Sequence, residues 1–72
     1  MTRLEHLAWA KERALEYVEH GDLKNAVTSM TSDLLKHEGF DYETTMFLAT
    51  VGMMDAAKGD TGAVRHWVEG FN

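Results

Sequence analysis

Histidine and carboxylate pairs at helical spacing are the closest approach to a chemical motif in this sequence. Glu16 and His20 lie four residues apart, and so do Asp33 and His37. This spacing puts two side chains on one face of a helix, as a metal site needs. Both pairs also lie where a helix is expected to end, and there a histidine gains from the helix dipole and from a carboxylate partner. We therefore expect structural pairs and no metal site.

The groups that catalysis uses most are missing or isolated. The sequence has no cysteine, no glycine-rich phosphate loop and no Gly-x-Ser-x-Gly motif. Ser29 and Ser32 have only a generic histidine within reach along the chain. A chain of 72 residues buries only about 60% of its unfolded surface, which leaves little room for a dry pocket. We expect neither enzymatic activity nor a cofactor.

The charge pattern argues against a nucleic-acid partner. The formal net charge is −5 at pH 7, and the seven basic residues are scattered singly. Binding to phosphates needs a basic patch instead. A DNA-reading second helix would offer polar side chains but no arginine, namely Lys24, Asn25, Thr28 and Ser29. A nucleic-acid-associated regulator, or an acidic mimic of nucleic acid, stays open as the alternative function.

Two Gly-Asp pairs organise the elements that carry these residues. Gly readily takes the left-handed conformation just past a helix end, and Asp is a common N-cap. Gly21-Asp22 and Gly59-Asp60 can therefore each close one helix and open the next. Thr2 with Glu5 forms a capping-box pattern at the start of the chain. We predict one all-α domain over residues 1–72, with four helices in two antiparallel hairpins: 2–20, 22–37, 41–58 and 60–71.

A short segment should connect the two hairpins. Gly39 is expected to take the left-handed conformation that stops the second helix. Phe40 should then pack back on the core, and Asp41 should cap the third helix.

The third helix is apolar on most sides, which is typical of a central helix or of one that meets a partner. Gly52 inside it predicts that a neighbouring helix passes close to its backbone. The short fourth helix has one apolar face and is not stable alone, so it must dock on its own chain or on another copy.

Part of this apolar surface is expected to form an interface, and we predict a homodimer built on the third and fourth helices. Trp67 is the expected anchor, although it could instead close the core of its own chain. Trp9 lies off the main apolar stripe of the first helix, where it could cover a hairpin edge or serve as an exposed anchor. The candidate interface residues are Trp9, Met53, Trp67, Val68 and Phe71.

The two Gly-Asp pairs belong to a weak internal repeat. Ala26-Val27 follows the first pair, and Ala63-Val64 follows the second. With Ala14 and Tyr17 ahead of it, the first copy resembles the inter-helix turn of a tetratricopeptide repeat. That resemblance implies the geometry of a helical hairpin, and no peptide-binding groove.

Over nearly its whole length the sequence also resembles a group of small helical proteins of tailed bacteriophages that have no assigned activity. The matching stretches include Ala10-Lys11, Arg13 to Tyr17, Gly52-Met53-Met54, and the run from Gly59 through Trp67 to Phe71. The resemblance implies an accessory protein in the bacterial cytoplasm that binds and modulates or inhibits a host protein, including a defence component. The charged N-terminal stretch leads to no apolar run of membrane length, which agrees with a cytoplasmic place and no membrane partner.

Overall fold

The computed structural model describes residues 1–72 and has four α-helices and no strand. The helices are α1 (Arg3–Glu19), α2 (Leu23–Leu35), α3 (Tyr42–Ala57) and α4 (Thr61–Glu69). The predicted all-α fold of two hairpins is confirmed. Each helix begins one residue later than expected, because the capping residue itself lies outside the helix, and each ends one or two residues earlier.

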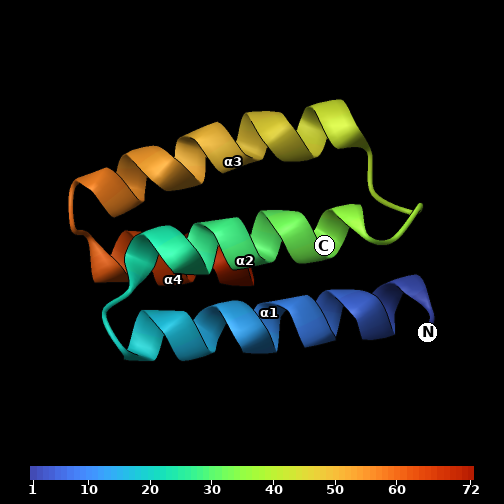
Figure 1. Cartoon of the computed structure of the whole chain (residues 1–72), viewed down its shortest axis with the longest axis horizontal. Coiled ribbons are helices and arrows are strands. Elements are labelled where there is room, and N and C mark those ends of the chain that lie inside the picture. The colour runs from blue at the N-terminus through green and yellow to red at the C-terminus, as the bar shows by residue number, and fades with distance from the viewer.

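Three of the helices form one layer, and the fourth packs behind it. Figure 1 shows α1, α2 and α3 side by side in alternating directions, with α2 in the middle. α1 and α3 do not pack on each other, whereas α4 contacts all three of the other helices. None of the four is both long and apolar enough to cross a membrane. Because nothing lies beyond it in the layer, α3 is an edge helix.

The helix starts are capped largely as expected. Thr2 accepts a hydrogen bond from the Glu5 N–H, and the Glu5 carboxylate accepts one from the Thr2 N–H, which completes the capping box. Asp41 and Asp60 accept backbone N–H bonds at α3 and α4. Asp22 differs, because it precedes α2 but its carboxylate accepts a hydrogen bond from the side chain of Asn25 at 2.7 Å. The Asp22 side chain therefore caps no backbone N–H of α2.

Two of the three expected glycine turns are confirmed. Gly21 has φ +73° and Gly59 has φ +70°, both in the left-handed region. The prediction for Gly39 is wrong, since no other residue has a positive φ. The reason for a glycine there is space: its N–H donates to His37 Nδ1 at 2.9 Å, and a Cβ would lie only 2.8 Å from that nitrogen.

The core has two clusters of buried side chains, and α4 contributes one valine to each. Val68 joins the first cluster and Val64 joins the second. The terminal helix therefore docks on its own chain. Phe40 packs against the first cluster, as expected. The remaining members of the first are Leu7, Ala10, Ala14, Met30 and Leu34, and those of the second are Val18, Leu23, Ala26, Val27 and Ala56.

Candidate functional site

The most unusual surface belongs to α3, because this helix buries small residues and exposes large ones. Thr45, Gly52 and Ala56 are its buried residues. Phe47 and Met54 point the other way, with 69% and 58% of their surface exposed. We call the exposed side the outer α3 face; its large apolar residues are Tyr42, Met46, Phe47, Val51, Met53 and Met54.

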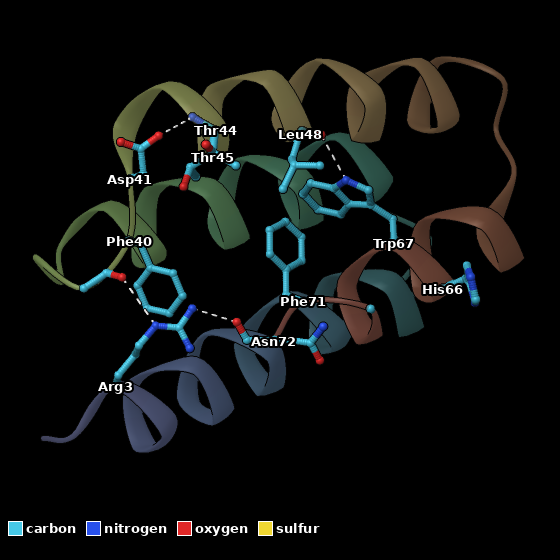
Figure 2. A pocket seen from close by; sticks show the side chains of 12 residues that line it. Arg3, Phe40, Asp41, Thr44, Thr45, Leu48, His66, Trp67, Phe71 and Asn72 are labelled. Carbon is cyan, nitrogen blue, oxygen red and sulfur yellow. Dashed lines mark hydrogen bonds between the residues drawn. The ribbon is translucent and has the colours of Figure 1, made fainter.

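Trp67 of α4 fills much of the space on the inner side of α3, where the Leu48 side chain is half-buried beside it. A Cβ at Gly52 would lie 2.6 Å from the Trp67 indole, so the missing side chain lets the ring reach the α3 backbone. The indole N–H then donates to the Leu48 carbonyl oxygen at 3.0 Å. Figure 2 shows this bond and Phe71 beside the indole. The prediction that a neighbour approaches Gly52 closely is confirmed.

The outer α3 face carries no charge along its middle. Glu43 lies near its first turn and Lys58 follows its last residue. Asp55, the only other charged residue of the helix, is half-buried and lies to one side. Thr50 and Ala57 complete the surface, and a shallow depression forms among Met46, Ala49, Thr50, Met53, Met54 and Ala57. A contiguous, exposed apolar surface of this kind is typical of a site at which one protein binds another.

A cleft of about 610 Å³ opens where the end of α4 meets the starts of α1 and α3. Aromatic rings line part of it: the Phe71 and Trp67 rings meet edge to face with their centroids 4.9 Å apart, and the Arg3 guanidinium carbon lies 4.4 Å from the centre of the Phe40 ring. Arg3 is held within the chain, because it donates to the main-chain oxygens of Gly39 and Asn72. The hydrogen bonds of Arg3 thus join the start of α1 to the loop before α3 and to Asn72.

A buried carboxylate fastens α1 to α2. Asp33 exposes only 3% of its side chain, and it pairs with Arg13 Nε at 2.7 Å and with Lys36 Nζ at 3.2 Å. Both cations also lie against the Trp9 ring, at 5.1 and 5.7 Å from its centre. A buried charge is tolerated when it is paired and hydrogen-bonded in this way. Sequence spacing could not find the pair, because Arg13 lies on another helix.

In neither carboxylate–histidine pair do the two side chains hydrogen-bond to each other. His20 Nδ1 donates to the main-chain oxygen of Glu16 at 2.7 Å, and not to its carboxylate. Asp33 turns to its cations, while His37 Nδ1 accepts the Gly39 N–H. No group of three or more His, Cys, Asp or Glu residues is placed to hold a metal ion.

The structure separates the five candidate interface residues. Val68 is fully buried, and Trp67 and Phe71 pack against the first core cluster. Trp9 is half-buried over the edge of the α1–α2 hairpin. Met53 alone lies on the outer α3 face, with 41% of its surface exposed.

Phe47 and Met54 were not among the predicted interface residues, although one signal in the sequence could have placed them on the outer α3 face. Three small residues that share one side of the helix, Thr45, Gly52 and Ala56, indicate the side that faces the bundle. The large residues opposite them then belong to the outside.

The chain matches no protein-family model, no curated protein and no solved structure.

Proposed function

We propose that this chain is a non-enzymatic accessory protein that acts by binding another protein through the outer α3 face. The observation that carries the proposal is the orientation of α3: the residues it buries are small, whereas Phe47, Met54 and most of its other large apolar residues are exposed. Exposing Phe47 and Met54 to water costs free energy that a partner would recover.

The chemistry of the face suits a protein partner. Methionine side chains are flexible and polarisable, so the face can adapt to a partner's shape. Its middle lacks the cations that a nucleic-acid backbone would need, and the chain carries a net charge of −5. The resemblance to small bacteriophage proteins supports a host protein, including a defence component, as the target in the bacterial cytoplasm.

Capture of host proteins by tagged chain tests this proposal. Wild type, Met54→Glu and Leu4→Glu would be compared in the bacterial host. Leu4 is the matched control, because it is 72% exposed and lies on α1, away from α3. We expect one host protein to be recovered with wild type and Leu4→Glu but not with Met54→Glu, and to bind purified chain with the same ranking.

Two results would contradict the proposal. Equal recovery of the same host protein by all three variants would show that the outer α3 face does not bind it. Retention of the wild type on DNA at about 0.15 M salt, lost as salt rises, would favour the nucleic-acid alternative.

A further inference from the structure

The outer α3 face has opposite charges at its two ends. Glu43, Phe47, Met54 and Lys58 follow one another in steps of four, seven and four residues, which places them on one stripe along the helix. Glu43 and Lys58 are both exposed, and neither belongs to an ion pair within the chain, since both ion pairs of the chain involve Asp33. The stripe therefore reads acidic, apolar, basic.

Two such stripes are complementary in charge when they lie antiparallel, because the acidic end of one then meets the basic end of the other. A two-fold axis through the stripe between Thr50 and Val51 would place Phe47 opposite Met54 of the partner subunit. It would also place Glu43 opposite Lys58 of the partner subunit. We propose that, in the free protein, the occupant of the outer α3 face is a second copy of this chain, with the two α3 helices packed antiparallel. The proposal rests on the protein-binding role of this face, and a host protein would compete with the second copy for it.

The physical terms agree with that arrangement. The thioether of Met54 would lie against the ring of the partner's Phe47, which is a favourable contact, and two-fold symmetry makes this contact occur twice. Antiparallel helices also bring opposite dipole ends together. No other element of the chain obstructs the approach, because α3 is the edge of the layer and α4 lies behind it (Figure 1). One 16-residue helix per subunit makes a small interface, so dissociation is expected in the micromolar range.

Sedimentation equilibrium over a concentration series measures the association. We expect wild type to pass from monomer to dimer at tens of micromolar, on the order expected for so small an interface. Met54→Glu should weaken the dimer by about 100-fold, because two carboxylates would be buried without partners. Leu4→Glu, the same change at an exposed apolar residue of α1, should leave the dissociation constant unchanged. Far-UV circular dichroism verifies that each variant is folded.

Charge reversal tests the antiparallel direction. Glu43→Lys and Lys58→Glu should each weaken the dimer by about fivefold, because like charges would then meet at both ends. The double variant restores opposite charges at both ends and should restore the affinity. Glu12→Lys, a charge reversal on α1, is the control. In a parallel pair the single variants would have no such effect, since like charges already meet there.

A wild-type chain that remains monomeric at about 200 µM would overturn the proposal, as would dimers that Met54→Glu leaves intact. A double variant no better than the single ones would overturn the antiparallel arrangement. These results would not by themselves contradict the proposed function. If the wild-type monomer captures a host protein and Met54→Glu does not, the outer α3 face binds that protein even though the chain forms no dimer.

Discussion

The α1–α2 hairpin and α3 differ in the size of the side chains that they bury. In the hairpin, large residues such as Met30 and Leu34 are buried, and the outside is mostly polar. In α3, the buried residues are small and most of the large ones are exposed, and the indole of Trp67 fills the space that a side chain at Gly52 would otherwise take. The comparison teaches that a helix can pack on a bundle through small residues and a neighbour's aromatic ring, which leaves most of its large side chains on the surface.

Truncating one methionine in each region should give the largest contrast. Met30 is fully buried, so Met30→Ala is expected to cost about 3 kcal/mol, a large part of the stability of a domain this small. Met54→Ala removes an exposed side chain and should change stability by less than about 0.5 kcal/mol. Urea unfolding followed by circular dichroism, at concentrations below dimer formation, measures both. Similar losses would show that the outer α3 face is part of the monomer core.

Adding a methyl group at Gly52 should disrupt the contact between α3 and the Trp67 indole. Alanine is the better helix former by about 1 kcal/mol. However, the rigid indole of Trp67 must move away and lose its bond to the Leu48 carbonyl, so Gly52→Ala should cost about 2 kcal/mol overall. The indole N–H resonance of Trp67 should shift as well.

Gly62→Ala is the matched control for that change. Gly62 is also helical, but the nearest atom to its added Cβ is Asp60 Oδ1 at an ordinary 3.6 Å. The control should stabilise the chain by up to about 1 kcal/mol. If Gly52→Ala stabilised the chain equally, the indole would not depend on the glycine.

The turn between α1 and α2 depends on backbone conformation alone. A Cβ at Gly21 would meet nothing within 4 Å, yet φ is +73°. Gly21→Val should therefore cost more than about 1 kcal/mol, while Gly21→Asn, which tolerates this region better, should cost less. Unfolding in urea ranks the two variants, and equal costs would show that the left-handed conformation is not what the turn requires.

Acid should act alike on α1 and α3, in spite of their different packing. Hydrogen bonds from the backbone and side chain of Thr2 lower the pKa of Glu5, and those of Thr44 lower the pKa of Asp41. Because each folded pKa lies below the carboxyl's ordinary value, the ionised carboxylate stabilises the folded chain fully above that ordinary value. This stabilisation is lost as the pH falls through the folded pKa. An NMR titration of the two carboxyl groups should show both midpoints below the ordinary range.

Asp41→Asn provides the control, since it keeps a neutral cap and should remove the pH dependence of the Thr44 amide signal. A midpoint for Asp41 at or above the ordinary carboxyl value would mean that its cap does not form in solution. This is the smallest effect expected, because both carboxyl groups are exposed.

Local chemistry was enough to predict the helices and most of their ends. Gly21 and Gly59 take the left-handed conformation, and Asp41 and Asp60 cap as expected, because these preferences act within a few residues along the chain. Gly39 was assigned to the same role, but its glycine is required by the ring of His37, a side chain whose position depends on how the loop is packed.

The sequence by itself therefore determined the number, order and approximate bounds of the helices, since periodicity, caps and turns are local. For α3 the sequence indicated only that a neighbour lies close to Gly52, and the tertiary structure decided that this neighbour is the Trp67 indole and that Phe47 and Met54 stay exposed. It likewise brought Arg13 to the buried carboxylate of Asp33. Contacts between helices depend on shapes that meet at long range in the chain, and no spacing rule within one helix records them.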